Sequence, residues 1–338
     1  MDLNTIWFIL VAVLIIGYAI LDGFDFGVGI LHLFLKDEHE KRISINAIGP
    51  VWDGNEVWLL TAGGALFAAF PIVYATVFSG FYLALMLLLV ALIFRAVSLE
   101  FRGKVESENW RKFWDYAFGI GSLLPSLLFG VAVGNILRGI PINEAGMFTG
   151  NFFTLLNPYS ILVGLLSVML FLMHGSVYLA LKSAGVQQEK MISYFPKFWI
   201  TFVILYLIVT TYSIFEAKFL FENILGNPLF WIMLIILLFG IFVMPVTFKA
   251  NKFFVTFILS SLTILGMISL MAISLFPRLV PSSINLDYSL TIYNSSSSET
   301  TLLTMLIIAL VGMPVVIGYT IFIYSRFKGK VALDEHSY

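Results

Sequence analysis

The sequence predicts an all-α polytopic membrane protein, a transmembrane helical bundle that forms a single integral membrane domain over residues 1–338. Hydrophobic residues make up 60% of the chain and charged residues only 12%, whereas a soluble domain carries about 25% charged residues. The hydrophobic residues fall in long runs, and a helix needs about 20 such residues to cross a bilayer. The basic residues lie between these runs, on alternate sides.

About nine runs have the length of a membrane span. They cover roughly residues 6–34, 51–72, 74–95, 114–136, 157–181, 197–216, 229–248, 253–276 and 302–325. The second run is the least apolar, because Asp53 and Glu56 interrupt its start. It also contains small residues such as Gly63 and Gly64, and small residues suit close contacts between membrane helices.

The distribution of basic residues predicts the orientation. If the amino terminus lies outside, only Arg138, Lys218 and Arg278 of the 19 basic residues fall on the outer side. The positive-inside rule favours this arrangement, which places the carboxyl terminus in the cytoplasm. Because no basic region precedes Ile6 and the first run exceeds signal-peptide length, we expect it to remain as a span.

The composition excludes several kinds of site and partner. Cysteine is absent, which excludes disulfides, thiolate metal sites and catalytic thiols. The formal net charge is −1, so nothing suggests a nucleic-acid partner.

Two pairs of acids lie inside predicted spans. Asp22 and Asp25 belong to the segment Leu-Asp-Gly-Phe-Asp-Phe-Gly-Val-Gly, and Asp53 and Glu56 belong to Val-Trp-Asp-Gly-Asn-Glu-Val-Trp. An acid at membrane depth is costly, so such residues indicate a functional site. The spacing of three residues places both acids of a pair on one helix face. All four are expected near the cytoplasmic boundary, where crowded carboxylates can exchange protons near neutral pH.

Structural interpretations of these acids remain open. Gly23, Gly27 and Gly29 could break the first helix, which would leave Asp22 and Asp25 in a solvated turn. Asp53 could be an N-cap residue favoured by the helix dipole. A calcium loop of the EF-hand type does not fit the spacing of the acids.

Other polar residues offer partners for the acids. Arg95 ends the third predicted span on the inner side and is a possible charge partner, or a residue that extends its head to water. Glu100 and Arg102 are expected to face water. His174 could bind haem, relay a proton or be a hydrogen-bonded packing residue. No pair of histidines is placed to ligate haem, and the remaining histidines are His32, His39 and His336.

The motifs around the acids resemble those of subunit II of the cytochrome bd quinol oxidases. The resemblance covers Gly17–Gly29, Ile45–Leu59, Gly63–Pro71 and Phe94–Arg95, so it is dense over residues 1–136 and rests on length and helix count beyond them. Ala96 departs from the pattern, since many members have proline after the arginine, and this affects the expected local end of the helix.

The resemblance implies a terminal quinol:dioxygen oxidoreductase of the respiratory chain in the bacterial cytoplasmic membrane. Such an enzyme reduces dioxygen to water and generates a proton motive force without pumping. Two b-type haems, one d-type haem and the quinol site would lie in the partner subunit I. Subunit II would bind no haem, would consist of two four-helix bundles and one extra helix, and would stabilise subunit I.

The resemblance also implicates Asp53 in a cytoplasmic proton path toward subunit I. Glu56, Asp25 and Asp22 are then expected in the same path, with Asp22 the most structural of the four. A structural quinone and a small single-span accessory subunit are further possible partners. The alternative function is a proton- or ion-coupled transporter, but transporters place the coupling site near the midplane between repeats. A scaffold whose acids only cap helices is a third possibility.

Overall fold

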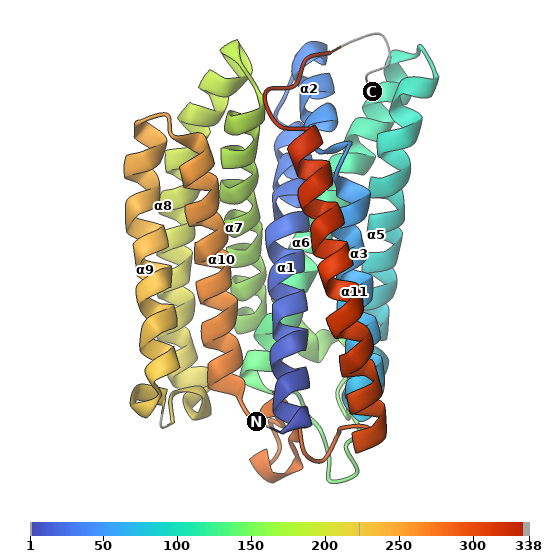
Figure 1. Ribbon diagram of the computed structural model, residues 1–338, viewed down its shortest axis with the longest axis vertical. Coiled ribbons are helices and arrows are strands. Elements are labelled where there is room, and N and C mark those ends of the chain that lie inside the picture. The colour runs from blue at the N-terminus through green and yellow to red at the C-terminus, as the bar shows by residue number, and fades with distance from the viewer. Residues whose placement is uncertain (1, 223, 334–338) are drawn as a thin grey trace.

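The computed structural model describes residues 2–222 and 224–333, and most of them lie in helices that run side by side as a tall bundle (Figure 1). The helices are α1 (Leu3–His32), α2 (Glu38–Ile48), α3 (Trp52–Ala69), α4 (Pro71–Gly80), α5 (Tyr82–Phe101), α6 (Glu108–Arg138), α7 (Pro158–Lys182), α8 (Gly185–Glu216), α9 (Pro228–Lys249), α10 (Phe253–Leu275) and α11 (Glu299–Arg326). Short 3-10 turns cover Arg102–Lys104, Phe152–Leu155, Lys218–Phe221, Ile224–Gly226 and Leu286–Tyr288.

The predicted transmembrane architecture is confirmed. Eight of the described helices are long and apolar enough to cross a membrane. Together with α3, which packs along α1, they account for the predicted spans (Figure 1). The 18 residues of α3 reach about 27 Å at a rise of about 1.5 Å per residue.

The predicted span 74–95 is wrong in its boundaries. Residues 71–80 form the separate helix α4, and α5 begins at Tyr82 and continues to Phe101. Pro71 begins α4, because a proline lacks the N–H that would continue α3. The break between α4 and α5 falls at Gly80–Phe81, inside an uninterrupted apolar run, so hydrophobicity alone could not locate it.

Two loops contain structure that was not predicted. The inner loop after α1 folds into α2, whose first turn is capped by Asp37: its carboxylate accepts hydrogen bonds from the backbone N–H groups of His39 and Glu40. The outer loop before α11 contains a small antiparallel pair, β1 (Arg278–Val280) with β2 (Leu290–Thr291). Neither departure changes the all-α membrane class.

The helices pack as two groups beside a peripheral helix. Helices α1, α3, α5 and α6 form one group, α7 to α10 form the second, and α11 lies against α1 and α3 (Figure 1). The groups meet where α7 packs on α1 and α6. The implied arrangement of two four-helix groups and one extra helix therefore matches the fold.

The glycines of α1 allow this contact and do not break the helix. Helix α1 is continuous through residues 21–29, so the interpretation of Asp22 and Asp25 as turn residues is wrong. A Cβ added at Gly27 would meet the Phe171 carbonyl oxygen and lie 2.9 Å from the Cα of Gly175. The backbones of α1 and α7 thus touch almost directly, as small residues permit in membrane bundles.

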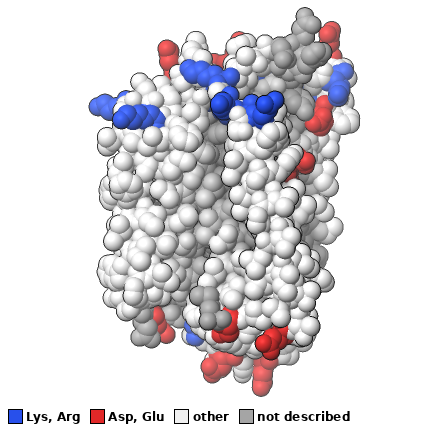
Figure 2. Space-filling view, viewed as in Figure 1, with Lys and Arg blue, Asp and Glu red and all other residues white. Residues whose placement is uncertain are grey.

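The two ends of the bundle differ in the charged residues that they carry. The described chain starts at one end and finishes at the opposite end (Figure 1). On the face shown in Figure 2, Lys and Arg gather at the end with the carboxyl-terminal segment, whereas acids dominate the other end. This asymmetry fits the predicted orientation, in which the basic end faces the cytoplasm.

Candidate functional site

A buried ion pair joins α1 to α5 near the basic end of the bundle. Arg95 donates from Nη1 to Asp22 Oδ2 at 3.0 Å and from Nη2 to Asp22 Oδ1 at 2.5 Å. Both side chains are completely buried. The guanidinium also lies over the Phe26 ring, with Cζ 4.2 Å from its centroid. This two-point contact makes Arg95 the partner of Asp22, which was one of the predicted possibilities.

Asp25 lies one turn further along α1 in a different environment. Its Oδ2 accepts a hydrogen bond from Asn55 Nδ2 at 2.7 Å, and Asn55 Oδ1 accepts one from the Tyr324 hydroxyl at 2.8 Å. The side chain of Asp25 is fully buried, and its Oδ1 has no hydrogen-bond partner among the described residues. Asp25 therefore has one oxygen fixed by α3 and α11 and one available.

The second acid pair extends from this site to the surface. A Glu56 carboxylate oxygen lies 4.0 Å from Arg95 Nη1, and 21% of the Glu56 side chain is exposed. Asp53, one turn earlier in α3, is exposed and makes no hydrogen bond or ion pair with a described residue. The N-cap interpretation of Asp53 is wrong, because Val51 is the N-cap residue and Asp53 lies in the first turn. Asp22, Asp25 and Glu56 surround the Arg95 region, whereas Asp53 lies outside it.

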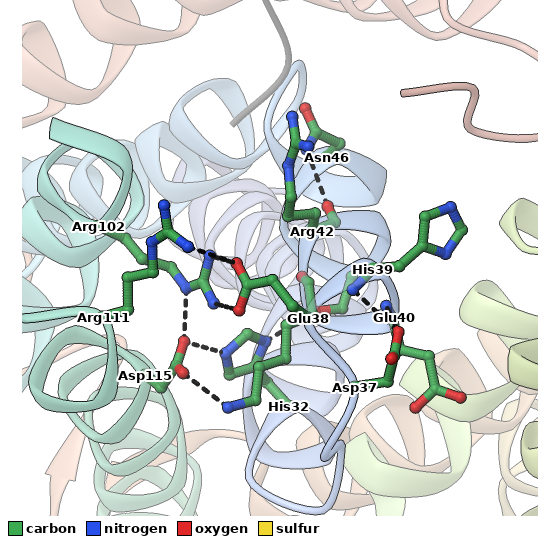
Figure 3. A network of polar contacts seen from close by, with 12 residues as sticks. His32, Asp37, Glu38, His39, Glu40, Arg42, Asn46, Arg102, Arg111 and Asp115 are labelled. Carbon is green, nitrogen blue, oxygen red and sulfur yellow. Dashed lines mark hydrogen bonds and ion pairs between the residues drawn. The ribbon is translucent and has the colours of Figure 1, made fainter. Parts of the chain in front are cut away.

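A second polar network lies at the basic end of the same helices (Figure 3). Asp115 on α6 accepts three contacts: from Arg102 Nε at 2.5 Å, from Lys41 Nζ at 2.7 Å, and from His32 Nε2, also at 2.7 Å. Arg102 also donates to both carboxylate oxygens of Glu38 at 2.9 Å. The network ties α1, α2 and α6 to the end of α5.

Sequence reasoning missed most of this network. Arg102 was expected to face water, but only 4% of it is exposed, because Asp115 and Glu38 satisfy its guanidinium. Glu100 is exposed as expected. Asp115 is the second residue of the predicted span 114–136. The cost of an acid inside a membrane span, which indicated Asp22, could therefore have indicated Asp115 as well. The partners of Asp115 come from three other elements, and only the fold brings them together.

The buried histidines have their ring nitrogens engaged within the chain. His174 Nδ1 lies 2.7 Å from Ser260 Oγ, and its Nε2 lies 3.0 Å from the Ile20 carbonyl oxygen. His32 Nδ1 lies 2.8 Å from Ser44 Oγ, opposite its contact with Asp115. His174 is thus a hydrogen-bonded packing residue between α1, α7 and α10. His39 is exposed, and His336 lies outside the described residues.

The arrangement is suited to holding and transferring protons. The exposure of the carboxylates decreases from Asp53 through Glu56 to the buried Asp22 and Asp25, and the Arg95 guanidinium is their counter-ion. Among the described residues, no group of three or more His, Cys, Asp or Glu is placed to hold a metal ion. With the ring nitrogens of His32 and His174 already engaged, the described site does not fit an axial haem ligand set.

Comparison with known proteins gives consistent matches over the whole chain. Residues 3–327 match the family model described as cytochrome bd terminal oxidase subunit II. The chain is 39% identical to the probable cytochrome oxidase subunit 2 of Haemophilus influenzae, covering 97% of this chain and 95% of that protein. It is 38% identical to the cytochrome bd-I ubiquinol oxidase subunit 2 of Escherichia coli K12, with coverage of 98% and 96%.

A third relative shows similar identity. The cytochrome bd ubiquinol oxidase subunit 2 of Bacillus subtilis is 38% identical, with 99% of this chain and 98% of that protein covered. Among solved structures, a chain of the bd oxidase from Geobacillus thermodenitrificans matches with a TM-score of 0.81 and 19% identity, covering 97% of this chain and 99% of that chain. This structural likeness concerns the fold.

Proposed function

Because the chain belongs to the cytochrome bd terminal oxidase subunit II family, we propose that it is the non-haem subunit of a quinol:dioxygen oxidoreductase. It is a multi-pass protein of the cytoplasmic membrane and part of a terminal oxidase complex. Within that complex it stabilises the haem-bearing subunit I and supplies part of a proton path for the reduction of dioxygen to water. Quinol, a structural quinone and a small single-span accessory subunit are further proposed partners.

The observation that carries the proton path is the acid series around the buried Arg95. Placing Asp22, Asp25 and Arg95 inside a membrane protein is costly, so a purely structural role is a poor explanation for the whole series. The series also reaches the surface at the basic end, through Glu56 and Asp53. Protons from the cytoplasm would enter at that end.

The four acids have different roles in this proposal. Asp53 takes up protons at the exposed first turn of α3, and Glu56 holds them one turn deeper, beside the charge of Arg95. Asp25 is the inner carrier, because one of its oxygens has no hydrogen-bond partner among the described residues. Asp22 remains the counter-ion of Arg95, because its two oxygens both accept from that guanidinium.

The face of α3 that carries the outer acids also suggests where subunit I lies. Asp53, Glu56, Val57 and Leu60 follow helical spacing and share one face. Val57 is 45% exposed and Leu60 is 72% exposed, so this face is apolar beyond the two acids. We place subunit I against the apolar part of this face, around Val57 and Leu60, which leaves Asp53 open at the basic end. Protons can then pass from the acids to the partner without crossing lipid.

Chemistry at the haems would belong to subunit I. The haems would supply electron transfer and dioxygen binding there, whereas the residues of this chain hold and move protons. The engaged nitrogens of His32 and His174 support this division, since neither residue is free to serve as an axial ligand.

Purification of the chain from its native membrane tests the proposal. A tagged chain should copurify with a haem-containing partner in a fixed ratio, and the complex should consume oxygen when supplied with quinol. Isolation of the chain as a stable haem-free protein that moves ions across vesicle membranes would instead favour the transporter function.

A further inference from the structure

Residues 327–333, which follow α11, lie across the basic end of the bundle and are called the strap below. Val331 donates its backbone N–H to the Lys182 carbonyl oxygen at 2.8 Å. In return, Lys182 Nζ donates to the Phe327 carbonyl oxygen at 2.5 Å. Between these contacts the chain turns at Gly329, whose φ of 97° suits glycine. Two hydrogen bonds therefore hold the strap against the end of α7.

A cavity of about 290 Å³ lies between the strap, α7 and the start of α3. Four cationic residues line it, and no Asp or Glu is among its described lining residues. The cations are Lys182, Arg326, Lys328 and Lys330. None of them forms an ion pair with a described acid, so their charge is not neutralised within the described chain.

The remaining polar groups of the cavity are already engaged. The Tyr178 hydroxyl donates to the Ala47 carbonyl oxygen at 2.9 Å, and the Tyr324 hydroxyl donates to Asn55 Oδ1 at 2.8 Å. The cavity thus combines aromatic walls with positive charge that no described acid neutralises. An anionic group that accepts several hydrogen bonds fits this combination, and lysine is a common partner of phosphate.

The position of the cavity favours a lipid headgroup as the source of the anion. The last turn of α11 lines it through Tyr324 and Arg326. The preceding turns of that helix expose apolar surface: Tyr319 is 62% exposed, Ile321 65% and Phe322 56%. A phosphate group in the cavity would therefore have apolar surface next to it for acyl chains. Anionic lipids of the cytoplasmic leaflet are attracted to basic segments at such a boundary.

From the strap, the cavity and its charge, we propose that the cavity binds a phosphate-bearing anion, with an anionic phospholipid headgroup as the natural source. The four cations of this site are distinct from the acid series, although Tyr324 contacts both the cavity and, through Asn55, Asp25. The proposal does not depend on the proposed proton path. The site would bind the lipid at the end of α7 and α11 and fasten the strap to the membrane boundary.

Native mass spectrometry of the purified complex tests this proposal. The complex is incubated with phosphatidylglycerol, with phosphatidylcholine or with inorganic phosphate, and the bound adducts are counted. The double variant Lys328→Gln/Lys330→Gln should bind phosphatidylglycerol roughly 30-fold more weakly than the unaltered complex. The variant Lys328→Arg/Lys330→Arg should retain binding, because it keeps the charge.

The matched control is Lys249→Gln/Lys252→Gln, which removes two exposed cations from the same end of the bundle, at the turn between α9 and α10. This control should leave the adduct unchanged. A phosphatidylglycerol adduct that is weakened by Lys328→Gln/Lys330→Gln, and not by the control, identifies a lipid as the source. If only the inorganic phosphate adduct is weakened in this way, the source is free phosphate. Equal loss in the two Gln pairs, or no adduct weakened by Lys328→Gln/Lys330→Gln, would overturn the proposal.

Discussion

Arg95 and Asp22 form a two-point ion pair in the interior of the bundle, with hydrogen bonds of 2.5 and 3.0 Å and no exposure of either side chain. The pair joins α5 to α1 and fixes one acid of the series as a permanent counter-ion. Asp25, one helical turn away, forms no ion pair with a described residue, and its Oδ1 has no described hydrogen-bond partner. Two acids with i,i+3 spacing on one helix therefore lie in different environments.

Removal of one partner of this pair should destabilise the complex strongly. Arg95→Ala leaves the Asp22 charge buried without a counter-ion, and such a loss costs about 3–5 kcal/mol. The double variant Asp22→Leu/Arg95→Met should recover much of this stability, because apolar groups replace both charges. The thermal midpoint of the purified complex is the measurement. A single variant as stable as the unaltered protein would show that the pair contributes little.

Substitution of Asp53 should affect turnover and not assembly. Asp53 is exposed and makes no hydrogen bond or ion pair with a described residue, so Asp53→Asn should leave yield and haem spectra unchanged. Oxygen consumption should slow by roughly an order of magnitude. Loss of a general acid–base catalyst slows a reaction by ~10²-fold or more, and the effect here should be smaller because water can replace an exposed proton carrier. Glu106→Gln, at another exposed acid of the same end, is the control and should be silent. Normal turnover of Asp53→Asn would contradict the proposed path.

Gly27 should not tolerate a methyl group. The added Cβ of Gly27→Ala would meet the Phe171 carbonyl oxygen and lie 2.9 Å from Gly175 Cα, so α1 and α7 would have to separate. The expected result is a severe loss of assembled complex, measured by size-exclusion chromatography. Gly312→Ala, at an exposed position of α11, is the matched control: outside its own helical turns, no described atom lies within 4 Å of its added Cβ. There alanine should favour the helix by up to about 1 kcal/mol. Equal yields of the two variants would argue against a close α1–α7 contact.

Asp115 should be essential for closing the basic end of the bundle. Asp115→Ala removes the shared acceptor of His32, Lys41 and Arg102, and leaves buried donors without a partner. Each hydrogen bond to a charged group contributes about 1.5–3 kcal/mol, so we expect a large drop in thermal midpoint. Glu108→Gln, which breaks the exposed pair with Lys112, should change the midpoint little. If both variants had the same midpoint, the network would not stabilise the helix ends.

The membrane class, the approximate positions of most spans, the distribution of basic residues and the presence of acids within the first two spans follow from the sequence alone. Each of these features is local: a run of apolar residues must be buried in lipid whatever its neighbours are, and an acid within such a run is costly in any arrangement. The motifs around Asp22 and Asp53 are also local, and they predicted the family that the comparisons confirm.

Only the tertiary structure decided which polar groups meet. It pairs Arg95 with Asp22, fixes Asp25 through Asn55 and Tyr324, and leaves Asp53 exposed. These contacts join residues far apart in the chain, and they depend on the rotation and depth of each helix. Helix rotation is set by packing, such as the contact of Gly27 with Gly175, and local hydrophobicity contains no information about it.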